Sequence, residues 1–127
     1  AIFEYEQVFQ NYPGSEVIAP ALFQTGVCYY QEALRSDYDQ RQADEALRYL
    51  QRFVRTFPDD PDRPRADEII AELWDRKARK SYEIARYYEK QDSPAGARIY
   101  YREVAEKYPE SEYAERARKK LEELPET

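Results

Sequence analysis

Few side chains in this 127-residue sequence could carry out catalysis. Histidine is absent, which removes the commonest general base and the commonest metal ligand. Cys28 is the only cysteine, so neither a cysteine-based zinc site nor a cysteine–histidine nucleophile can form. The three glycines stand at positions 14, 26 and 96 and build no phosphate-binding loop. These absences predict that the chain is not an enzyme and that it uses no cofactor.

Carboxylates are the remaining candidates for chemistry. Glu68 and Glu72 are four residues apart, so they would share one face of a helix. Their neighbours are charged, which favours a solvated surface over an acid–base pair. The run Asp59-Asp-Pro-Asp62 could suggest calcium, yet it lacks the glycine and the twelfth-position glutamate of an EF-hand loop. We therefore expect no metal site.

The strongest pattern in the sequence is an internal repeat. Three aromatic–proline pairs occur, and an alanine stands twelve positions before each proline, with large apolar residues four and seven positions after the alanine. An alanine lets two helices approach closely. The apolar residues four and seven positions later continue one apolar stripe, and the proline ends the helix. This is the second half of the tetratricopeptide pattern. The three sets are Ala1, Tyr5, Val8 and Tyr12-Pro13; Ala46, Leu50, Phe53 and Phe57-Pro58; and Ala97, Tyr101, Val104 and Tyr108-Pro109.

The first half of the pattern occurs twice. Leu22-x2-Thr25-Gly26-x2-Tyr29 and Ser81-x2-Ile84-Ala85-x2-Tyr88 occupy the places of Trp-x2-Leu-Gly-x2-Tyr. Nine positions separate Tyr88 from Ala97, as in an uninterrupted repeat, whereas seventeen separate Tyr29 from Ala46. The middle repeat therefore carries an insertion of eight residues, which we place in the polar stretch 35–43 as a loop or an extended helix end.

These spacings predict an all-α, tetratricopeptide-like right-handed superhelix of antiparallel helix pairs, folded as a single domain over residues 1–127. We expect helices at 1–12, 15–34, 43–57, 65–90, 94–108 and 113–124, with Ser15 and Ser111 as capping residues. The divisions are a partial repeat at 1–14, a repeat with an insertion at 15–60, a long-helix repeat at 64–110 and a capping helix at 111–124. Cys28 falls inside a helical pattern, which favours a small buried apolar residue over a lipidation site.

A chain of this kind would act by binding protein. The net charge of −6 argues against a nucleic-acid partner, and we expect a soluble chain because neither a membrane-spanning run nor a secretory leader is present. Seven tyrosines fit the repeat core, namely Tyr5, Tyr12, Tyr29, Tyr49, Tyr88, Tyr101 and Tyr108. First-helix residues facing away from the paired helix would form a concave wall that contacts a partner or packs on the neighbouring repeat. Those candidates are Phe23, Gln24, Val27, Tyr30, Tyr82, Glu83, Arg86 and Glu89.

Three runs of residues carry a family resemblance. They are Ser36-Asp37-x-Asp39 continued by Ala43, Ala46 and Arg52-Phe53-Val54-Arg55-x-x-Pro58; Tyr82-Glu83-x-Ala85-x-Tyr87-Tyr88; and Tyr108-Pro109-x-Ser111. Together with the insertion before Ala46, they resemble the BamD family of outer-membrane β-barrel assembly lipoproteins. The resemblance covers nearly the whole chain but only the C-terminal part of such proteins, which begin with a signal peptide, a lipidated cysteine and earlier repeats. We therefore expect a fragment or a trimmed domain.

The resemblance implies a periplasmic scaffold at the inner face of the outer membrane. Its partners would be the periplasmic domains of BamA and accessory lipoproteins, with unfolded outer-membrane proteins as further ligands, and it would touch the membrane only through a lipid anchor absent from this chain. Arg98 and Arg102 are candidates for ion pairs with a partner, with ordinary solvated arginines as the alternative. Two other functions stay open, a periplasmic repeat adaptor of the TolA-binding or cell-division kind that recognises peptides in its groove, and an enzyme accessory domain.

Overall fold

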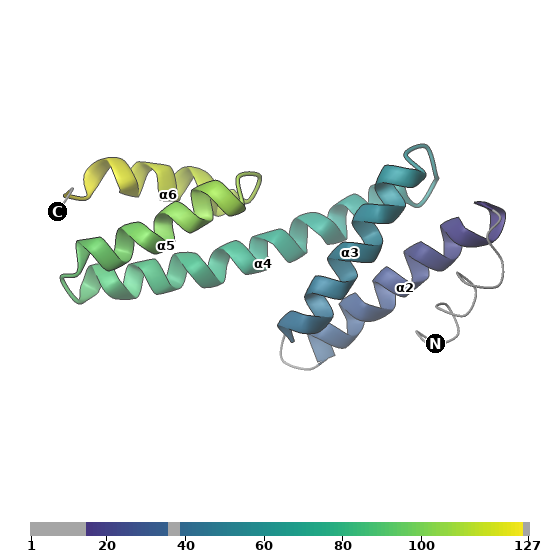
Figure 1. Cartoon of the computed structure of the whole chain (residues 1–127), viewed down its shortest axis with the longest axis horizontal. Helices are drawn as coiled ribbons and strands as arrows, with labels where there is room; N and C mark the ends of the chain where they lie inside the picture. Colours follow the sequence, from purple (N-terminus) through teal and green to yellow (C-terminus); the bar gives the residue numbers. More distant parts are fainter. Residues whose placement is uncertain (1–14, 36–38, 126–127) are drawn as a thin grey trace. The chain divides into compact units, whose positions relative to one another are not determined.

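The computed structural model describes residues 15–35 and 39–125 and shows an all-α protein (Figure 1). The described ranges contain the helices α2 (Ser15–Arg35), α3 (Gln40–Thr56), α4 (Arg63–Lys90), α5 (Pro94–Lys107) and α6 (Glu112–Glu123), and no strand. The chain divides into two compact units between Ile70 and Ala71, so α4 contributes its first turns to one unit and its later turns to the other. The all-α, tetratricopeptide-like fold is confirmed, whereas the superhelix and the repeat boundaries stay predictions. The helix expected at 1–12 lies outside the described residues.

The helix ends follow the prolines as predicted. Helix α3 ends at Thr56, where the Phe57 N–H donates to the Phe53 carbonyl at 2.8 Å, and Pro58 follows. Helix α5 ends in the same way one residue before Tyr108, and Pro109 follows. A proline lacks the N–H that would extend the helix, which favours a helix end at these two positions, although Pro20 is accommodated inside α2.

The start of α3 differs from the prediction. The helix begins at Gln40 rather than at residue 43, because the Asp39 carboxylate accepts the Arg41 N–H at 2.9 Å and satisfies one of the free donors of the first turn. Part of the eight-residue insertion is therefore helical. Ser15 is the first residue of α2, and its side chain lies outside the description, so its capping role stays a prediction.

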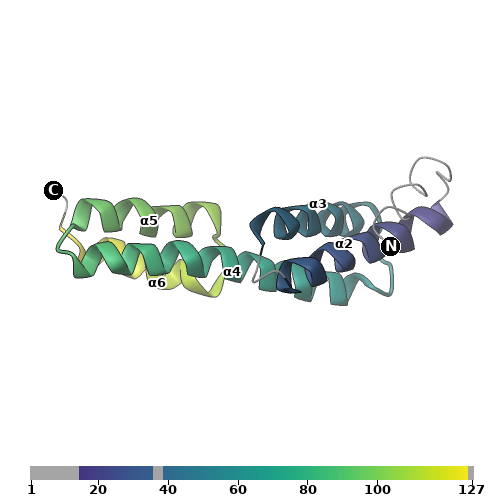
Figure 2. The same cartoon turned by 90° about the horizontal axis from the view of Figure 1, so that it is seen from below.

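In the first unit, α2 and α3 run antiparallel and side by side (Figures 1 and 2). They cross closely at Gly26, where an added Cβ would lie 2.6 Å from Cγ of Leu50, so only glycine fits this contact without displacing the leucine. Phe23 packs on Phe53 with ring centroids 5.4 Å apart. Ala46, Leu50 and Phe53 are fully buried, which confirms the predicted register of this repeat.

Two residues of α2 depart from a simple apolar core. Thr25 is fully buried, and its hydroxyl has no hydrogen-bond partner among the described residues. Cys28 is half-buried and free, so it is less enclosed than expected. The first turns of α4 also contribute to the core, because Ala66 and Ile69 are buried there.

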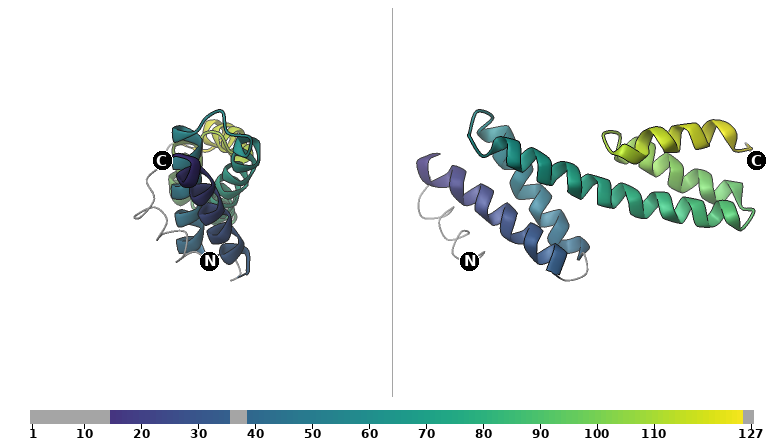
Figure 3. Two further views of the ribbon diagram at one scale, coloured as in Figure 1. Left: turned by 90° about the vertical axis from the view of Figure 1, so that its right-hand side faces the viewer. Right: turned by 180° about the vertical axis from the view of Figure 1, so that it is seen from behind.

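The second unit contains three helices: α5 returns along the later turns of α4, and α6 lies along α5 (Figures 1 to 3). Small residues make up most of its core, which allows the three helix backbones to approach closely. The fully buried members are Ala78, Ala85, Ala97, Tyr101, Val104 and Ala117. Ala97, Tyr101 and Val104 stand where the repeat pattern places them, as in the first unit.

The ends of α6 are held by side chains from other helices. Ser111 occupies the capping position, but its hydroxyl donates to the Tyr108 carbonyl at 2.8 Å and makes no cap hydrogen bond. Asp75 of α4 accepts the Glu112 N–H at 3.0 Å instead, which corrects the role predicted for Ser111. At the other end, the Arg98 guanidinium donates to the Leu121 and Leu124 carbonyls, both at 3.2 Å.

A candidate protein-docking surface

Glu89 ties the three helices of the second unit together. Its carboxylate accepts the Tyr101 hydroxyl of α5 at 2.6 Å and the Lys120 ammonium of α6 at 3.3 Å. The hydrogen bond from Tyr101 and then the contact with Lys120 hold the pKa of the Glu89 carboxyl below its ordinary value. Burial, followed by the hydrogen bond to Glu89, raises the pKa of Tyr101. Glu89 was a candidate for the partner-binding wall, and the structure gives it a role inside the fold.

The other wall candidates of this unit divide into enclosed and exposed residues. The Tyr82 ring lies between Tyr101 and Tyr113, with centroids 5.4 and 5.3 Å away, so α6 covers the face that we expected to be open. Glu83 is exposed and accepts the Arg79 guanidinium at 3.0 Å, while Arg86 is exposed. Tyr82 is therefore half-buried within the unit, and its contact with a partner stays a prediction.

In the first unit, the four wall candidates have different surroundings. Phe23 is buried against Phe53, Gln24 is exposed, and Val27 and Tyr30 are half-buried. Of the two arginines expected to pair with a partner, Arg98 donates to the end of α6, and Arg102 is exposed on α5. Gln24, Glu83, Arg86 and Arg102 are thus the candidates that remain on the surface, and their contact with a partner stays a prediction.

The exposed aromatic residue of the second unit is Tyr87, whose accessible fraction is 58%. Its ring lies edge-on to Tyr88 with centroids 5.6 Å apart, and Tyr88 stacks on Tyr100 of α5 at 5.6 Å with planes inclined by 9°. Gly96 makes room for this stack, because an added Cβ there would lie 2.8 Å from the Tyr88 ring. Tyr87, Tyr88 and Tyr100 thus form a continuous series of ring contacts. Sequence reasoning assigned Tyr88 to the core and did not select Tyr87 as a candidate for partner contact.

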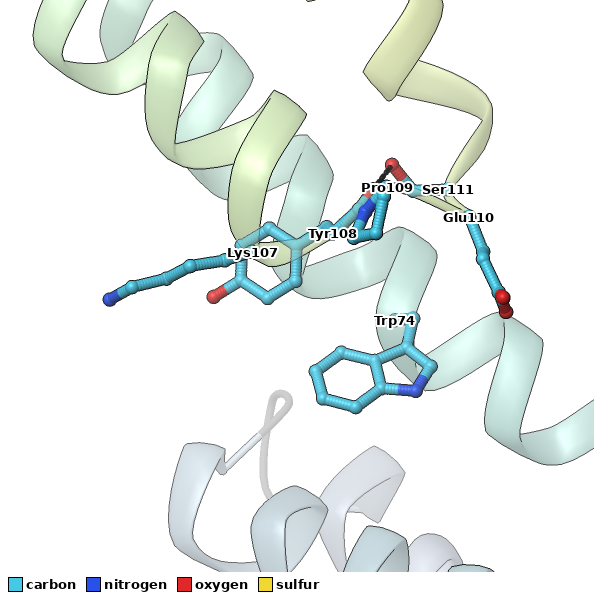
Figure 4. A pocket seen from close by; sticks show the side chains of 6 residues that line it. All are labelled: Trp74, Lys107, Tyr108, Pro109, Glu110 and Ser111. Atoms are coloured by element: carbon cyan, nitrogen blue, oxygen red, sulfur yellow. Dashed lines mark hydrogen bonds between the residues drawn. The ribbon is translucent and has the colours of Figure 1, made fainter.

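A second feature of this unit is a hollow of about 180 Å³ between α4 and the end of α5 (Figure 4). Trp74 and Tyr108 form its walls with ring centroids 5.7 Å apart, and Pro109 lies beside them. Figure 4 shows Lys107 and Glu110 extending in different directions at its edge. The Trp74 indole and the prolyl ring offer apolar surface on which an apolar side chain could pack.

Metal-ligand groups and membrane-spanning helices are both absent from residues 15–35 and 39–125. No group of three or more His, Cys, Asp or Glu side chains there could hold a metal ion. No helix in those ranges is both long enough and apolar enough to cross a membrane.

Comparison with known proteins places the chain in a family. The family model YfiO, described as an outer membrane lipoprotein, matches residues 1–127. A search of curated proteins finds no match. The match spans every residue, including both units and the insertion before α3, and it agrees with the resemblance found in the sequence. The chain belongs to the YfiO family of outer membrane lipoproteins.

Proposed function

We propose that this chain is a non-catalytic scaffold of the machinery that assembles β-barrel proteins in the outer membrane. In this proposal it is a BamD-type protein that docks the periplasmic domains of BamA and accessory lipoproteins and assists the insertion of outer-membrane proteins. The observation that carries the proposal is the outer membrane lipoprotein family match over residues 1–127. The lipid anchor of the parent protein would hold the chain on the periplasmic side of the outer membrane.

The structure supports a binding role through an exposed aromatic residue. Tyr87 is exposed by 58%, and Arg86 beside it on α4 is exposed as well. Tyrosine and arginine are enriched among the residues that dominate protein–protein affinity. The sequence also lacks histidine, and a scaffold requires no such reacting group.

The test is a pull-down from bacterial envelope extract with the tagged chain as bait, followed by identification of the retained proteins. We expect BamA and accessory lipoproteins of the assembly machinery to be recovered. Recovery of Tol or cell-division proteins in their place would favour the adaptor function and overturn this proposal. The purified periplasmic region of BamA, titrated against the chain by calorimetry, provides the direct measurement.

A further inference from the structure

The outer face of α4 carries a stripe of positive charge centred on Tyr87. Lys80 stands seven residues before Tyr87 and Lys90 three residues after it, so the three side chains share one face of the helix. Glu83 lies on the same face, but Arg79 donates to its carboxylate at 3.0 Å and balances its charge. Lys80 and Lys90 are exposed, and neither has an ion-pair partner within the described part of the chain.

The Tyr87 ring contacts a ring that is packed between helices. It lies edge-on to Tyr88, which is stacked on Tyr100 and contacts Gly96. A tyrosine loses little conformational entropy on association because its side chain has only two torsions. An exposed tyrosine flanked by two unpaired cations therefore has the composition of a binding anchor.

We propose that Lys80, Tyr87 and Lys90 form a docking stripe for an acidic segment of a partner protein. The Tyr87 ring covers an apolar or small side chain of that segment, and two carboxylates pair with the lysines. The lysines are ten positions apart on one helix, so their Cα atoms lie roughly 15 Å apart along it, and the two carboxylates need a comparable separation. This inference deepens the proposed function and rests on it, since it specifies the chemistry of the segment that the scaffold binds.

The charges favour a protein partner over a lipid surface. Attachment to an anionic membrane surface usually relies on a cluster of about four to eight lysines or arginines, so two lysines and one tyrosine give weak attachment. On a protein partner the same three residues meet fixed carboxylates and a fixed apolar contact, and a few such anchors supply most of the affinity. The lipid surface is kept as an outcome of the test.

The first experiment replaces Tyr87 with a photo-crosslinking amino acid in the tagged chain and irradiates it in envelope extract. Mass spectrometry then identifies the peptide or lipid joined to position 87. An adduct within a segment that carries Asp or Glu at the required separation supports the proposal. An adduct with phospholipid, an adduct with a basic or uncharged segment, or no adduct overturns it.

The second experiment measures affinity with the purified periplasmic region of BamA as the probe. We expect Tyr87→Ala to weaken binding by about 30-fold and Lys80→Glu or Lys90→Glu by about 10-fold each, with the lysine effects shrinking at high salt. Lys119→Glu is the matched control, because it makes the same charge change at an exposed position of α6 and should alter affinity less than about 2-fold. Gly96→Ala keeps every charge, displaces Tyr88 and should weaken binding by a few-fold.

The outcomes separate the two proposals. If BamA binds the unchanged chain and all variants equally well, the docking stripe is wrong and the scaffold function stands. If BamA does not bind the unchanged chain, the partner assigned under the proposed function is wrong, and the adduct at position 87 decides the docking stripe independently.

Discussion

In the first unit the returning helix places Ala46, Leu50 and Phe53 in the core, and in the second unit the same repeat positions hold Ala97, Tyr101 and Val104. The first set is entirely apolar and closes on Gly26. The second brings a phenol into the core, whose hydroxyl reaches Glu89 at 2.6 Å. The same repeat positions thus hold only apolar side chains in the first unit, whereas in the second unit they include a tyrosine that is hydrogen-bonded to Glu89.

The units also differ in charge. Residues 1–70 contain 13 acidic and 7 basic side chains, so they carry the whole net charge of −6, whereas residues 71–127 contain 13 of each. The ion pairs of the first unit join near neighbours in the chain, whereas in the second unit Glu89 of α4 pairs with Lys120 of α6 and Asp75 accepts the backbone N–H at the start of α6. The comparison indicates that the second unit gains more of its specificity from polar contacts, and its stability should respond to them.

The largest expected effect is the loss of stability at the third core position of the repeat, which is Phe53 in the first unit and Val104 in the second. Phe53→Ala should destabilise the first unit by about 3–5 kcal/mol, because a large ring is lost from a closed core. Val104→Ala in the second unit should cost about 2 kcal/mol, since it removes only two methyl-sized groups. Hydrogen exchange resolved by peptide measures each unit separately. Equal losses in the two variants would break the contrast drawn between the cores.

The next effect tests the polar link. Tyr101→Phe should destabilise the second unit by about 1.5–3 kcal/mol, because it removes a hydrogen bond to a charged carboxylate. Trp74 is the only tryptophan and belongs to the second unit, so its fluorescence during urea unfolding follows this unit. Tyr100→Phe is the control and should be nearly neutral, as the stacked ring is kept. A neutral Tyr101→Phe would show that packing alone holds this core.

Much of this architecture could be predicted from the sequence because it depends on local rules. A proline after an aromatic residue, with an alanine twelve positions before it, marks a helix end and a helix crossing, so Ala46, Ala97, Pro58 and Pro109 were assigned correctly. The start of α3 was missed by three residues. It depends on one carboxylate, that of Asp39, which the repeat pattern does not contain.

The candidate surface was harder to predict. Tyr82 and Tyr87 both lie outside the repeat-pattern positions of α4, and periodicity alone does not tell which of the two rings other helices will cover. Helix α6 brings Tyr113 against Tyr82, and Tyr87 is left exposed. The role of Arg98 depends on where α6 ends, a tertiary contact with no local signature. Sequence reasoning therefore identified the helices but could not tell which of the candidate side chains stay exposed on them, and their contact with a partner stays a prediction.

A smaller effect of opposite sign is expected in the first unit. The Thr25 hydroxyl is buried without a hydrogen-bond partner among the described residues, so Thr25→Val should stabilise this unit by about 1 kcal/mol. The two side chains have nearly the same shape, which keeps the packing on Leu22 and its neighbours. The thermal midpoint and the exchange rates of α2 provide the measurement, with Thr25→Ala as a control that should be destabilising. A loss of stability in the valine variant would reveal a hydrogen bond that the apolar description of this core omits.

The smallest expected effect is a pH dependence confined to the second unit. The pKa of Glu89 is lowered from its ordinary value of 4.5 by the hydrogen bond from Tyr101 and by Lys120. A carboxyl with a lowered pKa in the folded state stabilises the fold above its ordinary pKa, and this contribution is lost as the pH falls through the folded-state value. Trp74 fluorescence should therefore report weaker stability below about pH 4.5, and Glu89→Gln should remove this part of the acid dependence at a constant cost at neutral pH. If the glutamine variant keeps the full acid dependence, other carboxylates produce it, and the polar link at Glu89 matters less than its geometry suggests.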